Sequence, residues 1–157
     1  MNTISEIREA TIDDFDQIIQ LERKCFPGHL AYSSDQLYYL LTKAHRTFLV
    51  ETYDKILRGF IIVLIRQGSS VAGLETVNVD PDYHNQGIGT RLLHAAEEEM
   101  KKHKIKTVRL EVSPGNHAAL NLYKNEGYTI ISRIKNYYTY NHQHSRDALR
   151  MIKELSP

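Results

Sequence analysis

The sequence predicts a mixed α/β domain in which helices pack on a largely antiparallel sheet. Seven short segments are rich in β-branched and apolar residues, and four other segments carry apolar residues at helical spacing. At 157 residues and 41% hydrophobic content, the chain is large enough for one ordinary hydrophobic core and too small for two. We therefore expect one domain spanning residues 1–157, with about seven strands and four helices.

The first quarter of the chain is predicted to hold one strand and two helices. The segment SEIREA has the composition of a short strand, and the hydroxyl of the following Thr11 can cap a helix whose apolar residues recur at helical spacing. The segment CFPGHLAYSS contains Pro27 and Gly28 and is predicted to be a loop. A second helix follows, because Ser33 and Gln36 have the spacing of a capping box before LYYLL.

Three antiparallel strands and a long helix are expected next. The strands are TFLVE, LRGFIIVLIR and SVAGLETVNVD, separated by TYDK and QGSS. From Gly87 onward the apolar residues Ile88, Leu92, Ala96 and Met100 recur every four residues with charged residues between them. This spacing predicts a helix that lies on a sheet.

The last third of the chain is predicted to contain three strands and a short helix. KTVRLEV returns to strand-like alternation, and NHAALNLYKNEG is a helix that Gly127 ends with a left-handed C-cap. YTIISRIKNYY and ALRMIKEL are the two final strands, joined by the polar turn NHQHSRD.

Composition and charge exclude several classes of protein. Twenty basic and nineteen acidic residues leave a net charge of +1, so no nucleic acid or anionic membrane is expected as a partner. The single cysteine, Cys25, excludes an intramolecular disulfide framework, and MNTISEIREA has no basic leader with an apolar segment. The longest apolar run, FIIVLI, is too short to cross a bilayer. A cytoplasmic protein is expected.

The segment VNVDPDYHNQGIGTRLL joins a predicted strand to a predicted helix through two glycines. The first N–H groups of a helix lack partners and carry a partial positive charge, which makes such a junction a site for phosphate. Gly87 and Gly89 let the backbone approach an anion, while the main chains of Gln86, Ile88 and Thr90 supply donors. An ordinary glycine-containing loop would have a similar sequence, so the motif alone leaves both interpretations open.

A dinucleotide site is a weaker interpretation of the same residues. GIGTRL begins like the G-x-G-x-x-G fingerprint, and Glu111 follows 22 residues after Gly89, near the place of a ribose-binding acid. Leu92, however, stands in place of the third glycine, and DPDYHNQ separates the strand from the first one.

The motifs of this chain resemble those of the GNAT superfamily of N-acetyltransferases. HNQGIG matches the family's cofactor motif, and LEVSPGNHAALNLYKNEGY, NYY and DALRM follow in the family's order. The resemblance covers nearly the whole chain and is greatest to the ribosomal-protein-alanine (RimI-like) N-terminal acetyltransferases. Two departures are His84, which stands where Gln or Arg is usual, and the proline of SPGN.

The resemblance implies the GNAT fold, with splayed central strands, and acetyl-CoA as the cofactor. The pyrophosphate would lie on the backbone at the start of the long helix, and the pantetheine arm would pair with the strand before it. The residues implied in cofactor binding are Val77, Val79, Asn85, Gln86, Gly87, Gly89, Thr90, Asn116 and Tyr123.

Acetyl transfer from a thioester requires a neutral amine, a stabilised oxyanion and a proton for the departing thiolate. An α-amino group titrates near about 7.7–8.0 and a lysine near about 10.4, so a chain N-terminus needs only a modest base. Glu111 is the favoured base, because alternation in VRLEV places it on the face opposite Leu110. Glu75 is the competing base; by alternation it shares a face with Val77 unless the strand bulges, and it could act through a water.

The resemblance implies that Tyr123 is the acid, since its phenol is protonated at neutral pH and it matches the family's tyrosine in NLYKNEGY. Without that resemblance, its helical spacing with Ala119 would indicate a core aromatic.

Aromatic residues of two loops are the candidates for binding the acceptor amine, together with Glu75. The candidate acceptor residues are Phe26, Pro27, Tyr32, Glu75, Tyr137 and Tyr138. The two late tyrosines are also compatible with an ordinary edge strand. HQH at 142–144 lacks further ligands and is expected to be a solvated turn, so no metal site is predicted, and Cys25 has no setting for a nucleophile.

We therefore expect an acetyl-CoA-dependent N-acetyltransferase that acts on the N-terminus of a protein or peptide, as a monomer or homodimer. One alternative acceptor is a lysine side chain, a polyamine or another small amine, which a narrow acidic pocket would favour. A second alternative is an acyl-CoA-binding sensor without catalytic activity.

Overall fold

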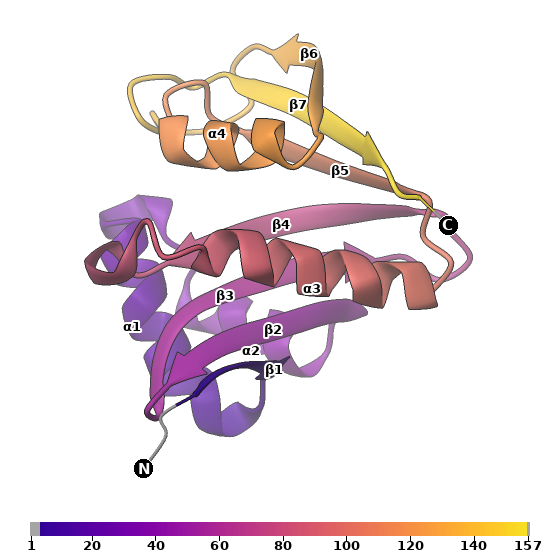
Figure 1. The fold of residues 1–157 in the computed structure, drawn as a ribbon. Helices are drawn as coiled ribbons and strands as arrows, with labels where there is room; N and C mark the ends of the chain where they lie inside the picture. Colours follow the sequence, from indigo (N-terminus) through magenta and orange to yellow (C-terminus); the bar gives the residue numbers. More distant parts are fainter. Residues whose placement is uncertain (1–3, 157) are drawn as a thin grey trace.

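The computed structural model describes residues 4–156, which form one seven-stranded sheet with helices on both faces (Figure 1). Its order is β1-β2-β3-β4-β5-β7-β6. The strands are β1 (Ser5–Glu9), β2 (Arg46–Tyr53), β3 (Ile56–Ile65), β4 (Val71–Val79), β5 (Thr107–Val112), β6 (Thr129–Ile134) and β7 (Ala148–Glu154). Within the same residues, the four α-helices are α1 (Phe15–Cys25), α2 (Ser34–Thr42), α3 (Ile88–Lys102) and α4 (His117–Asn125).

The predicted mixed α/β architecture is thereby confirmed. Residues 1–3 and 157 lie outside the described part of the chain. The predicted domain of residues 1–157 includes all four of them, and the expectation that the first ten residues hold no leader includes residues 1–3. In the part described, none of the helices is long and apolar enough to cross a bilayer.

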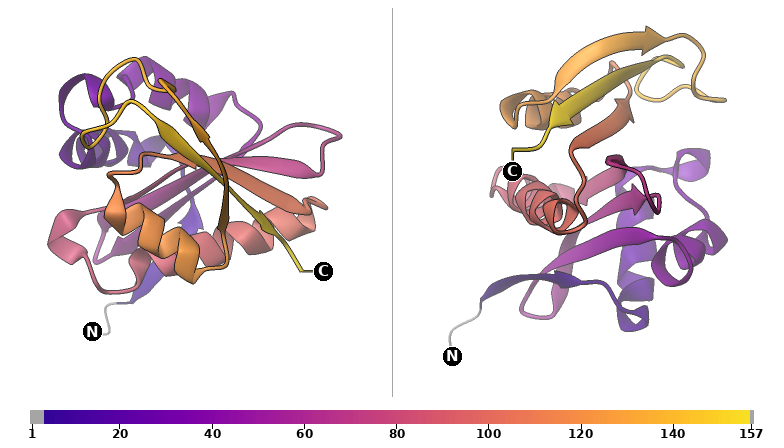
Figure 2. Two further views of the ribbon diagram at one scale, coloured as in Figure 1. Left: turned by 90° about the horizontal axis from the view of Figure 1, so that it is seen from above. Right: turned by 90° about the vertical axis from the view of Figure 1, so that its right-hand side faces the viewer.

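The helices form two layers around the sheet (Figure 2). Helices α1 and α2 cover one face, where they enclose a cluster that includes Ile18, Leu37 and Phe48. Helices α3 and α4 cover the other face. The predicted stripe of α3 is buried there, since Ile88, Leu92, Ala96 and Met100 are each at most 1% exposed. The sheet therefore holds a core on each face.

Strands β4 and β5 separate after a short contact. They pair in parallel only at Val71–Thr107, Ala72–Val108 and Gly73–Arg109, and beyond Gly73 they diverge (Figure 1). The other neighbouring strands of the described sheet are antiparallel. The expected splayed centre of the sheet is present, and β4 leaves one edge of its second half without a partner strand.

A β-bulge at Glu75 changes the direction of this side chain. Ile62 pairs with Thr76 and the next residue of β3, Val63, pairs with Leu74, so that Glu75 is the extra residue. The carboxylate of Glu75 accepts a hydrogen bond from the hydroxyl of Tyr32, in the loop between α1 and α2. Simple alternation, which would place Glu75 on the face of Val77, is therefore interrupted.

Two local expectations differ from the structure. Thr11 is the N-cap of a short 3-10 turn, Ile12–Asp14, which runs directly into α1, and the N-cap of α1 itself is Asp14. The strand predicted as YTIISRIKNYY ends at Ile134, because Asn136 takes a left-handed conformation with φ 53° that breaks the extended chain. Tyr137 and Tyr138 therefore lie in the β6–β7 loop and not on an edge strand.

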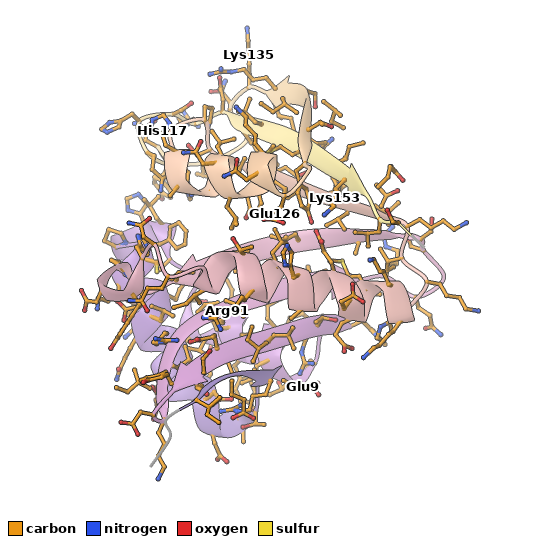
Figure 3. All side chains as sticks on the ribbon, in the orientation of Figure 1. Glu9, Arg91, His117, Glu126, Lys135 and Lys153 are labelled. Carbon is orange, nitrogen blue, oxygen red and sulfur yellow. The ribbon has the colours of Figure 1, made fainter. Side chains whose placement is uncertain are left out.

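Ion pairs and a histidine–carboxylate hydrogen bond hold α3 to the rest of the molecule on two sides. On one side, Arg91 of α3 lies 3.2 Å from the carboxylate of Glu51 on β2. On the other, Lys153 of β7 lies 3.0 Å from Glu97 of α3, and His94 of α3 lies 2.5 Å from Glu126, beyond the end of α4. Figure 3 shows Arg91 below α3 and Lys153 and Glu126 above it.

Glu51 is fully buried and accepts several hydrogen bonds. Arg58 donates to both of its oxygens, through Nε at 2.9 Å and through Nη2, and the Ser5 hydroxyl donates at 2.6 Å. Burial alone would raise the pKa of Glu51, but these hydrogen bonds and the charges of Arg58 and Arg91 outweigh it and lower the pKa. The carboxylate is therefore ionised in the folded protein.

Replacing Glu51 by Gln should destabilise the protein by about 3 kcal/mol or more, because Arg58 is left buried without its counter-charge. Since the folded-state pKa lies below the unfolded one, the contribution of Glu51 is complete above the unfolded pKa and disappears as pH falls through the folded pKa. Urea unfolding between about pH 7 and about pH 3 should therefore show a steeper acid loss for the wild type than for E51Q. The exposed pair variant E98Q is the matched control, with little effect expected. An equal effect of the two variants would contradict this account.

Candidate active site

The N-terminus of α3 presents unpaired backbone donors. Gly87 precedes the helix in the left-handed conformation with φ 76°, which turns the chain from the loop into α3. Within residues 4–156, the N–H groups of residues 86–90 donate to no other residue. Unpaired amides at a helix start favour an anion, so this end of α3 has the donor set of a phosphate site.

A cavity of about 410 Å³ lies against this helix end, and we call it the α3 cavity. Most of the residues expected to bind the cofactor line it: Val77, Val79, Asn85, Gly87, Gly89, Thr90, Asn116 and Tyr123. Gln86 belongs to the same loop but is exposed and not among the lining residues. At Gly89 an added Cβ would lie 3.3 Å from Leu122, so glycine keeps the cavity wall close to α4.

The main chain of β4 faces this cavity. The N–H of Asp80 donates to Arg58 on β3, and alternate residues of a strand point their main-chain groups to opposite sides. The groups of Val77 and Val79 therefore point away from β3, into the opening beside β5. The carbonyl of Val79 is contacted there by His84 Nε2 at 3.0 Å and by the Cys25 thiol at 3.5 Å.

His84 and Cys25 thus both contact the end of β4. His84 is the residue that stands where Gln or Arg is usual. Its contact with the Val79 carbonyl ties the loop before Gly87 to the end of β4. For Cys25, burial raises the pKa of the thiol to about 12, so it is protonated at neutral pH and lacks the thiolate that a nucleophile requires.

A second cavity, of about 340 Å³, lies between the α1–α2 loop (residues 26–33), β5 and the β6–β7 loop; we call it the loop cavity. Of the residues predicted for catalysis and acceptor binding, those that line it are Phe26, Tyr32, Glu75, Glu111, Tyr123 and Tyr138. Pro27 and Tyr137 line neither cavity. The two cavities share the residues Phe26, Val77, Asn116, Ala119, Tyr123 and Gln143, and so they adjoin where β4 and β5 diverge.

Glu111 is held in a fixed orientation in the loop cavity. The alternation predicted for β5 is confirmed, with Leu110 buried and Glu111 turned to the other face. Its Oε2 accepts from Arg150 Nε at 3.0 Å and lies 3.5 Å from Arg109 Nε. Its Oε1 is approached only by the hydroxyl of Tyr137, at 3.5 Å, among the described residues. One oxygen is therefore bound by two guanidinium groups, and the other is left for a ligand.

Tyr123 stands between the two cavities with a free hydroxyl. The side chain is 5% exposed and packs on Tyr128, with ring centroids 5.7 Å apart. Within residues 4–156 its hydroxyl makes no hydrogen bond, and it is not among the side-chain atoms sealed from solvent. Burial raises the pKa of Tyr123, which keeps the phenol protonated. The core aromatic is confirmed, and its polar end lies at the cavities, while the role of Tyr123 as the acid stays a prediction.

The β6–β7 loop contributes residues that the sequence analysis did not select. His142 stacks on Tyr138 with ring centroids 4.0 Å apart, and its carbonyl accepts from the Ser113 hydroxyl at 2.6 Å. Gln143 lines both cavities, and a Cβ at Gly115 would meet its carbonyl at 1.9 Å. The expected turn at 142–144 is present, but His142 and Gln143 are only half-exposed because they pack at the cavities. In the chain from 4 to 156, no group of His, Cys, Asp and Glu side chains is arranged to hold a metal ion.

Glu22, Thr76 and His29 also line the loop cavity without having been predicted. Nothing local in the sequence distinguishes them, since each is brought to the cavity by contacts between elements far apart in the chain.

Comparison with known proteins places this arrangement among the acetyltransferases. Residues 15–128 match the family model for the Acetyltransferase (GNAT) family. The chain is 32% identical over 146 residues to an N-alpha-acetyltransferase of Sulfurisphaera tokodaii, covering 84% of each chain. These matches confirm the resemblance found in the sequence.

Solved structures share the fold. The ribosomal-protein-S18-alanine N-acetyltransferase from Escherichia coli superposes with a TM-score of 0.86 and 25% identity, over 98% of this chain and 96% of that one. Naa50 of Arabidopsis thaliana, in complex with the bisubstrate analogue CoA-Ac-MVNAL, superposes with a TM-score of 0.82 and 22% identity, over 96% and 99% of the two chains.

Replacing Gly87 by Ala should weaken the binding of coenzyme A by about 5- to 30-fold. A left-handed conformation costs an L-residue about 1–2 kcal/mol, and the loop must return to it to present its amides. Calorimetric titration measures the change. Gly68→Ala is the matched control, because Gly68 has φ 80° and equally open surroundings in the turn between β3 and β4. If G68A weakens binding as much as G87A, the phosphate site has been misplaced.

Proposed function

Because this chain belongs to the GNAT family of acetyltransferases, we propose that it transfers the acetyl group of acetyl-CoA to the N-terminal α-amine of a protein or peptide. The chain is an N-acetyltransferase with acetyl-CoA as its cosubstrate, and the proposal concerns its acceptor and the residues that act. The proposal also treats residues 1–157 as a single acetyltransferase domain, which is supported by the one seven-stranded sheet of the described residues.

The observation that carries the proposal is the meeting of the two cavities at Tyr123. The α3 cavity has anion-binding amides at one end, and the loop cavity has the carboxylates of Glu75 and Glu111. A donor in the first and an amine in the second would meet where β4 and β5 diverge. Tyr123 lines both cavities at that point.

Acetyl-CoA fits the α3 cavity through three kinds of contact. The free amides of residues 86–90 would bind its pyrophosphate, with the Asn85 side chain nearby. The main chains of Val77 and Val79 would pair with the pantetheine arm as an added strand. Asn116, which lines both cavities, would contact the arm from the β5 side. Bound there, acetyl-CoA supplies the activated acyl group.

Glu111 is the base in this proposal. Its Oε1 is free of the two arginines and could take the proton of the acceptor ammonium directly or through a water. Glu75 is the competing base, since its carboxylate is held by the neutral hydroxyl of Tyr32.

Tyr123 donates a hydrogen bond to the leaving sulfur. The family resemblance implies the role of the acid for Tyr123. Because burial raises the pKa of its phenol while a thiol titrates near about 8.5, we propose that the phenol retains its proton and stabilises the thiolate through this hydrogen bond, and that solvent protonates the thiolate.

An extended peptide fits the loop cavity through its aromatic walls. Phe26, Tyr32 and Tyr138 offer apolar rings, and two of them carry hydroxyls for main-chain hydrogen bonds. The names of the relatives, an N-alpha-acetyltransferase and a ribosomal-protein-alanine N-acetyltransferase, support the same acceptor. Pro27 and Tyr137 lie outside the cavity lining, so their proposed contact is with residues further along the peptide.

A second candidate acceptor is a lysine, a polyamine or another small amine. Three carboxylates, those of Glu22, Glu75 and Glu111, line the loop cavity, and such an acidic wall also suits a small polycation.

A panel of peptides with different first residues, measured beside spermidine and lysine-containing peptides with blocked N-termini, distinguishes these acceptors. Release of the coenzyme A thiol should be fastest with a subset of free N-terminal peptides. Faster release with spermidine or the blocked peptides would show that the acceptor is a polyamine or a lysine, the second candidate. Binding of acetyl-CoA without release for any amine would leave only the sensor that lacks catalytic activity.

Tyr123→Phe should lower kcat by about 10- to 100-fold with little change in acetyl-CoA affinity, because it removes only the hydroxyl that stabilises the leaving group. Glu111→Gln should lower kcat by a similar factor and Glu75→Gln by much less. Steady-state kinetics with the best peptide measures all three.

The surface variant Tyr39→Phe, on the exposed side of α2, is the matched control for loss of a phenol hydroxyl. If E75Q reduces kcat more than E111Q does, Glu75 is the base. Unchanged kcat in Y123F would remove Tyr123 from the chemistry.

A further inference from the structure

Glu22 is a buried carboxylate that is neither the base nor the acid of the proposed acetyl transfer to a peptide. It lies on α1, is 1% exposed and forms part of the wall of the loop cavity. Its Oε1 accepts from the Asn78 amide at 2.8 Å, and its Oε2 accepts from the backbone N–H of Tyr32 at 3.0 Å. Among residues 4–156, no basic group lies within ion-pair distance of it.

Stability alone does not explain this residue. Glu22 occupies the buried face of α1 beside Ile18 and Leu21, where an apolar side chain would pack without losing the hydration of a charge. Burial raises the pKa of Glu22, which is the sign of that lost hydration. A glutamate at this position loses hydration that an apolar residue would not lose, and its hydrogen bonds to Asn78 and Tyr32 indicate what it provides in return.

These hydrogen bonds join three separate elements around the loop cavity. Asn78 belongs to β4, and its Oδ1 also accepts from the Thr76 hydroxyl at 2.6 Å. Tyr32 belongs to the α1–α2 loop, and its hydroxyl donates to Glu75 at the bulge of β4. Tyr32 is thus held at both ends, its backbone by Glu22 and its hydroxyl by Glu75.

We propose that Glu22 is a positioning residue for acceptor binding. By accepting the N–H of Tyr32, its carboxylate fixes the α1–α2 loop against β4, so that the acceptor meets a loop cavity that is already formed. This inference rests on the proposed function for the identity of the acceptor. The fixed loop itself is a property of the protein without ligands.

Glu22→Gln and Glu22→Met form a matched pair that separates hydrogen bonding from charge and from packing. Gln has no charge, but its side-chain oxygen can still accept from the Tyr32 N–H. Its NH₂ group then donates to the oxygen of the Asn78 amide, which turns over to accept it. Met has nearly the same length, favours helices, adapts its shape and offers no useful acceptor. Only the Met variant therefore loses the bond to the Tyr32 N–H.

For E22M we expect the KM of the acceptor to rise about tenfold or more, with kcat and acetyl-CoA affinity within about twofold of wild type. For E22Q the KM should stay within about threefold. Hydrogen–deuterium exchange without ligands should show faster exchange of the Tyr32 amide in E22M than in wild type or E22Q. Glu22→Leu serves as the second apolar variant should E22M not fold.

Three results would overturn the proposal. Unchanged exchange at Tyr32 in E22M would mean that Glu22 does not hold the loop. Faster exchange with unchanged KM would mean that the held loop has no part in acceptor binding. An equal rise of KM in E22Q and E22M would assign the effect to the charge of Glu22. If wild type accepts only small amines, the proposed function fails, and the same comparison is made with that amine.

Discussion

The separation of β4 and β5 after three residue pairs is the constraint on which the site depends. A strand inside a sheet normally finds a partner on each side, and buried main-chain groups without partners are costly. Along the second half of β4 the missing partner strand is replaced by scattered contacts, such as those of His84 and Cys25 to the Val79 carbonyl. The other main-chain groups of this half of β4 face the α3 cavity, where they are available to a ligand.

The same separation gives the two carboxylates different surroundings. Glu111, on β5, is bound on one side by Arg150 and Arg109, which come from the half of the molecule beyond the opening. For Glu75, on the bulge of β4, the hydrogen bond formed within residues 4–156 is that from the neutral hydroxyl of Tyr32. An arriving ammonium group thus meets one carboxylate whose orientation is set by cations and one that is set by a phenol. Their roles can differ although both line one cavity.

Much of the fold could be predicted from the sequence because its signals are local. The stripe from Ile88 to Met100, the capping box of Ser33 and Gln36, and the glycine before α3 are each specified by neighbouring residues.

The errors arose where a distant contact or a backbone conformation decided the result. Asn136 ended β6 earlier than its apolar composition suggested, and the bulge at Glu75 depends on the register with β3. His142 and Glu22 reach the loop cavity through contacts with Ser113, Tyr138, Asn78 and Tyr32 that sequence spacing does not reveal.

The buried contacts of Glu97 limit how the molecule can deform. Beside the three residue pairs at the closed end of the opening, Glu97 binds Lys153 of β7 and the hydroxyl of Tyr128, and so ties α3 to the strands beyond the opening. Widening the gap between β4 and β5 would require these buried polar groups to part in surroundings with little water, which is unfavourable. The gap between β4 and β5 therefore resists widening. Substitutions in the loops at its rim, which do not carry these contacts, are then the route by which selectivity can change without rebuilding the sheet.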